Sequence, residues 1–176
     1  MPENKDHLHI TLVVATTADG FITSQDDPLP QHWTSEEDKL HLSKIVLNYP
    51  LLVMGERTYR VHQPKNTSKH IVVLSHNTTQ KIISEHADIQ NLSPRQFTEK
   101  YQSFKKCLLL GGAYTYQEFL KEKLVDEAYV TVEPLFAQSG ISFLQKGKKL
   151  EDYGLKLREK ISLNNKGTEL CYYHLI

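Results

Sequence analysis

Three uninterrupted apolar runs, each ending in glycine or a small polar residue, constrain the fold of this chain most. They are residues 51–54 before Gly55, residues 71–74 before Ser75, and residues 108–110 before Gly111 and Gly112. Runs without polar alternation are typical of strands that are covered on both faces, as in a parallel sheet. Two of the runs lead into helical patterns, so we predict parallel strands whose carboxyl ends share one edge of a sheet.

The remaining pattern alternates strands with helices and closes with a hairpin. Residues 9–16, 21–23 and 128–132 are predicted strands, and helices are predicted from Trp33 to about Tyr49 and over residues 94–104. Residues 24–31 form a polar loop, and strands 155–163 and 169–175 flank a turn at residues 164–167. We therefore expect an α/β fold with one domain, 1–176. It is a three-layer sandwich with a mixed, mainly parallel central sheet, helices on both faces and a C-terminal antiparallel hairpin.

Charge and cysteine content limit the cellular compartment and the classes of partner that we expect. Lysine plus arginine and aspartate plus glutamate both total 21, so no net field attracts nucleic acid or a membrane surface. The absence of a signal peptide or a spanning apolar run predicts a cytoplasmic protein. Cys107 and Cys171 are expected to be reduced core residues. The nine histidines lack zinc-ligand spacing, so we predict no metal site.

The pair Gly111 and Gly112 is the first candidate binding element. Glycine has no Cβ, so its backbone can approach a ligand closely, and the following helix offers unpaired N–H groups at its positive end. Such a turn suits an anion, most often a phosphate. The alternative is a turn that only links strand to helix. Gly55 and Ser75 at the same predicted edge favour the ligand site, because adjacent helix starts suit a dinucleotide with separated phosphates.

Two acids are candidates for proton chemistry. Asp38 lies four residues before the apolar stripe of its helix, so it shares the inward face. Ser35 with Asp38, or Thr34 with Glu37, also fits a capping box. Asp38 is therefore either a cap or a reactive acid. Asp19 precedes a glycine, a combination that is also common in turns.

Six short motifs follow one another along nearly the whole chain. They are Thr17-Ala18-Asp19-Gly20-Phe21-Ile22, Trp33-Thr34-Ser35-Glu36-Glu37-Asp38, Val53-Met54-Gly55-Glu56-Arg57-Thr58-Tyr59, Val72-Val73-Leu74-Ser75, Leu110-Gly111-Gly112-Ala113, and Leu124-Val125-Asp126-Glu127 continuing to Val132-Glu133-Pro134. In this order and spacing they resemble the dihydrofolate reductase fold and, within it, the reductase domain of riboflavin biosynthesis.

The resemblance implies an NADPH-dependent reductase that transfers hydride to a small-molecule substrate, a heterocycle or an imine. The nearest members are the 5-amino-6-(5-phosphoribosylamino)uracil reductases. The cofactor contacts that it implies are Gly111, Gly112, Ala113, Tyr114 and Thr115 at the pyrophosphate, Gly55, Arg57 and Thr58 along the cofactor, Leu74, Ser75 and His76 toward the adenosine 2′-phosphate, and Ala15, Gly20, Phe21 and Ile22 beside the nicotinamide. Trp33 and Asp38 would bind substrate. Asp38 or Asp19 would supply the proton or hydrogen bond that hydride addition to a ring needs. A homodimer through sheet edges near the carboxyl terminus is also implied.

Departures from the family pattern leave the substrate open. Riboflavin-type reductases tend to have Glu before the glycine pair, where this chain has Leu110, and an Asp-Asp-Pro segment where residues 59–64 read Tyr-Arg-Val-His-Gln-Pro. Folate reductases normally show Pro-Trp, whereas Pro30 and Trp33 are separated here. A dihydrofolate reductase is therefore the alternative. A non-catalytic NADPH-binding module is the alternative from another class.

Overall fold

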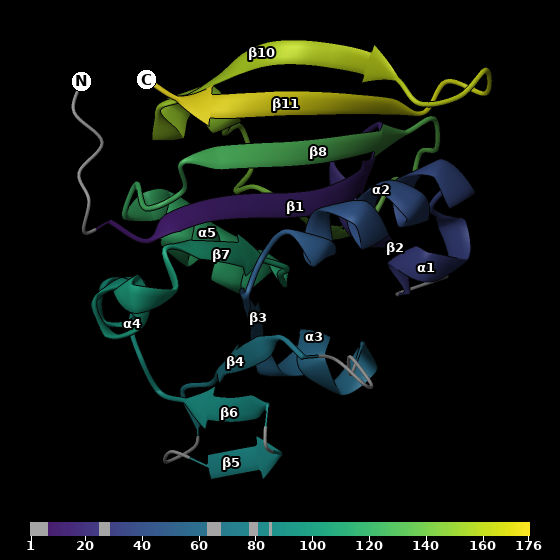
Figure 1. Cartoon of the computed structure of the whole chain (residues 1–176). Helices are drawn as coiled ribbons and strands as arrows, with labels where there is room; N and C mark the ends of the chain where they lie inside the picture. Colours follow the sequence, from purple (N-terminus) through teal and green to yellow (C-terminus); the bar gives the residue numbers. More distant parts are fainter. Residues whose placement is uncertain (1–6, 25–28, 63–67, 78–80, 85) are drawn as a thin grey trace.

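The structure, a computed structural model, describes residues 7–24, 29–62, 68–77, 81–84 and 86–176. These residues build a nine-stranded sheet in the order β10-β11-β8-β1-β7-β3-β4-β6-β5 (Figure 1). The parallel strands are β8 (Glu127–Glu133), β1 (His9–Thr17), β7 (Lys106–Leu109), β3 (Leu51–Gly55), β4 (His70–Leu74) and β6 (Ala87–Gln90). The antiparallel strands are β10 (Leu155–Ser162), β11 (Glu169–Leu175) and β5 (Lys81–Ser84). The mixed, mainly parallel sheet with a C-terminal hairpin is thus confirmed.

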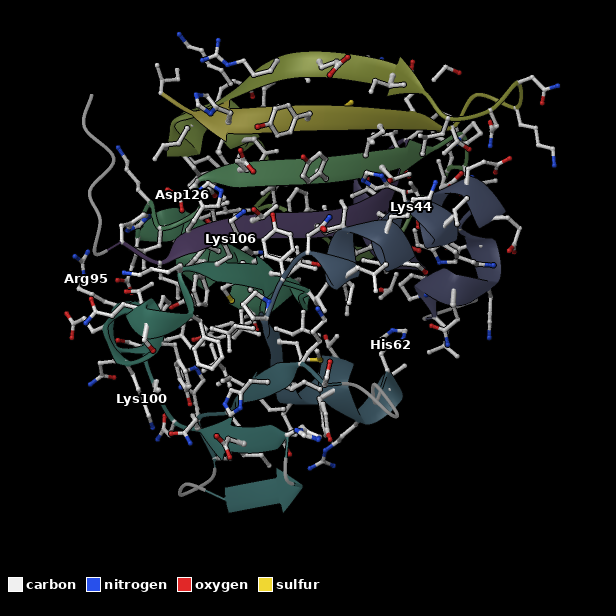
Figure 2. All side chains as sticks on the ribbon, in the orientation of Figure 1. Lys44, His62, Arg95, Lys100, Lys106 and Asp126 are labelled. Carbon is white, nitrogen blue, oxygen red and sulfur yellow. The ribbon has the colours of Figure 1, made fainter. Side chains whose placement is uncertain are left out.

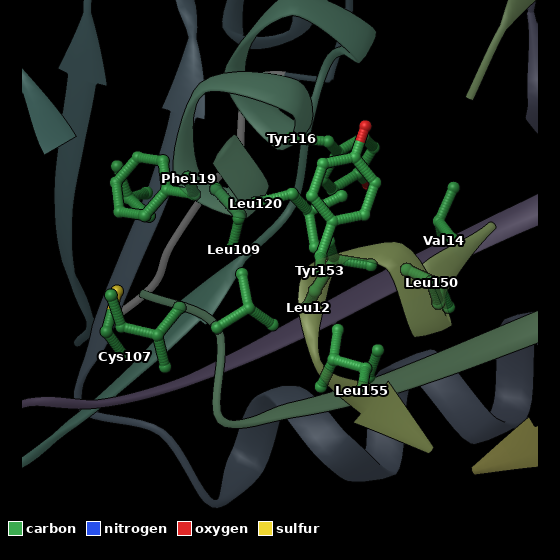
Figure 3. Packing of buried hydrophobic residues seen from close by; sticks show 14 of the residues in the cluster. Leu12, Val14, Cys107, Leu109, Tyr116, Phe119, Leu120, Leu150, Tyr153 and Leu155 are labelled. Carbon is green, nitrogen blue, oxygen red and sulfur yellow. The ribbon is translucent and has the colours of Figure 1, made fainter. Parts of the chain in front are cut away.

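Helices cover both faces of the sheet, which confirms the three layers. The main helices are α2 (Glu36–Leu47), α3 (Glu56–Val61), α4 (Pro94–Tyr101) and α5 (Ala113–Lys121). Side chains of α2 and α3 pack on a buried cluster that includes Val13 and Met54. On the other face, Phe119 and Tyr116 of α5 lie in a cluster with Leu109 of the sheet (Figure 3).

The predicted strands and helices are present, with some changed boundaries. The helix expected from Trp33 to about Tyr49 is shorter, because Ser35 caps α2, which begins at Glu36 and ends at Leu47. Trp33 belongs to a separate short helix, α1 (Pro30–Trp33). The helix over 94–104 tightens at its end into the 3₁₀ turn η1 (Gln102–Phe104). A second 3₁₀ turn, η2 (Leu150–Tyr153), precedes β10. Residues 25–28 of the polar loop lie outside the described residues.

Four short elements were not predicted: α1, β5, β6 and β9 (Gly140–Ser142). β9 pairs with β2 (Phe21–Ser24) in a small separate sheet. Each of the four has only three or four residues, which is too short to produce a periodic pattern.

Both cysteines are buried and free, as expected. Across the described ranges, no three His, Cys, Asp or Glu side chains gather in a way that could hold a metal ion. Within the same residues, no helix has the length and apolar character needed to cross a bilayer.

The amino ends of the parallel strands lie together at one edge of the sheet. Lys106 begins β7 and Asp126 precedes β8, so both mark the amino ends of the strands that flank β1 (Figure 2). The candidate site lies at the opposite ends of these strands.

Candidate functional site

Backbone hydrogen bonds link the carboxyl ends of β3 and β7, which were predicted to share one edge of the sheet. The Gly55 backbone N–H donates to the Gly111 carbonyl at 2.7 Å, and the Leu110 N–H donates to the Val53 carbonyl at 2.9 Å. The end of β3 therefore lies against the turn that begins α5. Because β4 pairs with β3 in parallel register, its own end follows at the same edge.

Glycine lets the starts of α3 and α5 approach each other closely. An ideal Cβ on Gly55 would lie 2.7 Å from Thr115 Oγ1, and one on Gly112 would lie 3.1 Å from Thr58 Oγ1. These residues were all expected to contact the cofactor, and the structure brings them together. The glycines are therefore required by the packing of two helix starts, whatever else they bind.

Gly111 packs against the buried side chain of Tyr116. Its φ of 109° lies in the left-handed region that favours glycine, and the Gly111-Gly112 peptide bond is cis. The buried Tyr116 hydroxyl donates to the Val13 carbonyl at 2.6 Å. A Cβ on Gly111 would lie 3.0 Å from that hydroxyl. The conformation of the turn is thus set by the sheet and by α5 together.

The start of α5 differs from that of the serine-capped helices. Ser35 accepts a hydrogen bond from α2 and Ser93 accepts one from α4, both at 3.2 Å. The N-cap residue of α5 is Gly112, which has no side chain to accept one. The first-turn N–H groups of this nine-residue helix are therefore available to an anion.

Ser75 and His76 follow β4 and reach the two helix starts. Ser75 Oγ donates to the Glu56 carboxylate of α3 at 2.6 Å. The His76 ring packs edge-on against Tyr114 of α5, with ring centroids 5.4 Å apart. Arg57 of α3 is exposed, and Leu74 is half-buried.

The residues expected beside the nicotinamide have different surroundings. Ala15 is half-buried and pairs in register with Thr131 of β8. Gly20 is exposed and its carbonyl accepts the Phe143 N–H at 3.1 Å. Phe21 is half-buried, whereas Ile22 is only 9% exposed and belongs to the core. Ile22 therefore contributes packing.

Asp38 points inward from the first turn of α2, as predicted, and is 7% exposed. Half of the expected capping box forms, because Ser35 Oγ accepts the Asp38 N–H. The other half does not, because the Ser35 N–H donates instead to the Glu133 carboxylate at 2.7 Å. The Asp38 carboxyl is therefore released from capping and hydrogen-bonds to Thr131 and Thr34.

The surroundings of Asp38 favour its protonated form. Burial raises the pKa of Asp38, the nearby Glu133 charge raises it further, and the hydrogen bonds from Thr131 and Thr34 only partly oppose this. Burial also raises the pKa of Tyr116, and the charge of Asp38 adds to that rise. A buried carboxyl of this kind can hold a proton and deliver it to a ligand.

Glu133 is the residue that sequence analysis missed. It is 3% exposed at the end of β8, where it accepts from Ser35 and, at 2.7 Å, from Thr168 Oγ1. Its place before Pro134 was visible in the sequence. Its partners were not, because they lie 98 and 35 residues away.

A cavity of about 280 Å³ opens beside this junction. Trp33, Ser35, Glu133 and Lys166 are among its lining residues. The buried indole nitrogen of Trp33 has no hydrogen-bond partner among the described atoms. Trp33, expected to bind substrate, thus shares the cavity with two neighbours of Asp38.

Asp19 holds two loops together. Its carboxylate accepts hydrogen bonds from Thr17 Oγ1 at 2.6 Å and from the N–H groups of Ala137 at 3.1 Å and Gln138 at 2.8 Å. Burial acts to raise the pKa of Asp19, but these hydrogen bonds outweigh it and lower the pKa below its usual value. An ionised, fully engaged carboxylate is a poor proton donor, so the geometry favours Asp38 as the acid.

The chain matches the family model described as dihydrofolate reductase over residues 9–144. A solved structure of a protein from Shewanella sp. PV-4 that is named for riboflavin biosynthesis has a TM-score of 0.71 at 20% identity, covering 94% of this chain and 98% of that one. A diaminohydroxyphosphoribosylaminopyrimidine deaminase/5-amino-6-(5-phosphoribosylamino)uracil reductase from Thermotoga maritima has a TM-score of 0.77 at 14% identity, covering 98% of this chain and 58% of that one. No curated protein matches the chain. At these identities the structural likeness shows a common fold.

Proposed function

This chain belongs to the dihydrofolate reductase family, and we propose that it is a reductase that transfers hydride from a reduced nicotinamide dinucleotide to a small heterocyclic or imine-containing substrate. The observation that carries the proposal is Asp38, a buried acid released from capping at the carboxyl edge of a parallel sheet. A proton held there complements hydride addition, because a substrate nitrogen must gain a proton as the neighbouring carbon gains hydride.

The cofactor would lie along the carboxyl edge of the sheet, where small residues leave the backbone accessible. Gly112 and the first turn of α5 would hold a phosphate, with Gly55 and Thr58 on the neighbouring side. Ala15, beside Thr131, would face the nicotinamide. When bound, the dinucleotide would supply the hydride, while Thr131 and Thr34 would orient the Asp38 carboxyl and its burial would favour the protonated form.

The first substrate candidate is a 5-amino-6-(5-phosphoribosylamino)uracil, the class that the Thermotoga relative's name supports. Dihydrofolate is the second, supported by the family match. A dinucleotide-binding module without catalysis is the third reading. The homodimer implied by the resemblance stays a prediction.

The test is an activity screen of the full chain with NADPH and with NADH against both substrate candidates. We expect turnover with one of them, and we expect Asp38→Asn to lower turnover more than dinucleotide affinity. Asp88→Asn is the matched control, since Asp88 pairs with His70 of β4 at 3.3 Å, near the other edge of the sheet. Dinucleotide binding without turnover would favour the non-catalytic module. Full activity in Asp38→Asn would remove Asp38 from the chemistry.

A further inference from the structure

The strand order indicates where the second nucleoside of the proposed cofactor would lie. Asp38 bonds to Thr131 on β8, and the phosphate-binding start of α5 follows β7. A dinucleotide that extends from Asp38 across Gly112 must continue over the ends of β3 and β4. Adjacent strands lie about 4.8 Å apart, so the end of β4 is roughly 14 Å from β1, within reach of an extended dinucleotide. This step rests on the proposed function.

A carboxylate occupies that end of the site. Gly55 and Leu74 pair in register, so the residues that follow them, Glu56 and Ser75, stand side by side. Ser75 Oγ donates to Glu56 Oε2 at 2.6 Å. The other carboxylate oxygen pairs with Arg60 one turn along α3. The Glu56 side chain is 24% exposed and that of Arg60 is 74% exposed, so the carboxylate is the more enclosed of the two charges.

These contacts keep Glu56 ionised and engage the Ser75 hydroxyl and the Arg60 guanidinium, whereas Arg57, the next residue of α3, is exposed. The hydrogen bond from Ser75, followed by that from Arg60, lowers the pKa of Glu56, so it is ionised at neutral pH. Ser75 is the residue expected to approach an adenosine 2′-phosphate, yet its hydroxyl proton is given to Glu56. The Arg60 charge is likewise balanced by Glu56.

We infer that Glu56 makes the site select a dinucleotide with a free adenosine 2′-hydroxyl, NADH, over the 2′-phosphorylated form, NADPH. A carboxylate can accept a hydrogen bond from a ribose hydroxyl. A 2′-phosphate would instead place a second anion beside Glu56 and compete with it for Ser75 and Arg60. The resemblance leads us to expect a reduced nicotinamide dinucleotide, and this inference keeps that class of cofactor. Within the class, it favours NADH over NADPH.

The test is equilibrium binding of NADH and of NADPH to the full chain without substrate, measured by calorimetry and by the fluorescence of the reduced nicotinamide. We expect NADH to bind about tenfold or more tightly than NADPH, because like charges brought together at a binding site are costly. Glu56→Gln should narrow that ratio by about tenfold, mainly through tighter NADPH binding, since glutamine can still bond to Ser75.

Two further variants control the comparison. Glu118→Gln removes a carboxylate that pairs with Lys121 on α5 at 2.8 Å, and it should leave the ratio unchanged. Arg60→Gln keeps Glu56 and should keep the preference for NADH. Tighter binding of NADPH by the wild type, or an unchanged ratio in folded Glu56→Gln, would overturn the role of Glu56 and leave the proposed function intact. Binding of neither dinucleotide would overturn the proposed function itself.

Discussion

At the scale of single residues, Asp38 has opposing effects on chemistry and stability. Burial with a raised pKa means that its ionised form is costly in the folded state. We expect Asp38→Asn to raise the free energy of unfolding at pH 7, because the amide removes the cost of burying a negative charge. Urea denaturation of both proteins would measure the difference.

The pH dependence of this difference has a definite sign. The folded state binds the Asp38 proton more tightly than the unfolded state does, so wild-type stability rises as pH falls through the raised pKa toward 3.8. The advantage of Asp38→Asn should therefore shrink on acidification. Asp88→Asn serves as control. A variant less stable than wild type at pH 7 would mean that Thr131 and Thr34 stabilise the carboxylate by more than burial costs.

Sequence periodicity placed Asp38 on the inward face of its helix, but not the groups that set its chemistry. Thr131 and Glu133 come from a strand more than ninety residues later, and local patterns carry no information on such contacts. The same holds for Gly112. The sequence indicated that glycine at this position lets the backbone approach a ligand closely. The structure shows that Thr58 of α3 also leaves little room for a side chain there.

At the scale of elements, Glu133 joins the end of β8 to the start of α2 and to the C-terminal hairpin. Its two acceptor contacts, to Ser35 and Thr168, are both 2.7 Å long. Glu133→Gln would turn one acceptor into an amide donor facing another donor. We expect a loss of about 2 kcal/mol in the free energy of unfolding, the usual cost of an unpaired buried polar group. Chemical denaturation measures it.

A double-mutant cycle separates this junction from a general effect of lost charge. Thr168→Val removes the hairpin's donor, so combining it with Glu133→Gln should cost less than the sum of the single changes. Glu118→Gln, on the opposite side of the sheet, is the charge control. Strict additivity of the two losses would show that the hairpin is held by other contacts.

The elements that the sequence predicted are those with a strong local signal. Long apolar runs became β1, β3, β4 and β7, and the serine caps became the starts of α2 and α4. β6 was missed because its four residues, ADIQ, are partly polar and pair with a strand already formed. Its register on β4 is a tertiary effect.

At the scale of the whole molecule, the fold class followed from the order of the patterns, while the site depends on how the sheet rearranges that order. Neighbours in the sheet such as β1, β7 and β3 are far apart in the chain. A ligand along their ends would connect segments around residues 15, 38, 55, 75 and 112. Such a ligand should therefore stabilise the whole fold against unfolding.

This argument predicts the response of the whole chain to a reduced dinucleotide. At a free concentration of about 100 times Kd, binding to the native state alone adds about 2.7 kcal/mol. For a domain of this size each kcal/mol corresponds to roughly 2–4 °C, so Tm should rise by about 5–10 °C. Circular dichroism melts would measure it, and the shift should grow with ligand concentration. Quenching of Trp33, the single tryptophan, should accompany binding, because Trp33 lies beside the neighbours of Asp38. A quench without a shift in Tm would contradict the proposed dinucleotide site, because any ligand that binds the native state in preference to the unfolded chain must raise Tm.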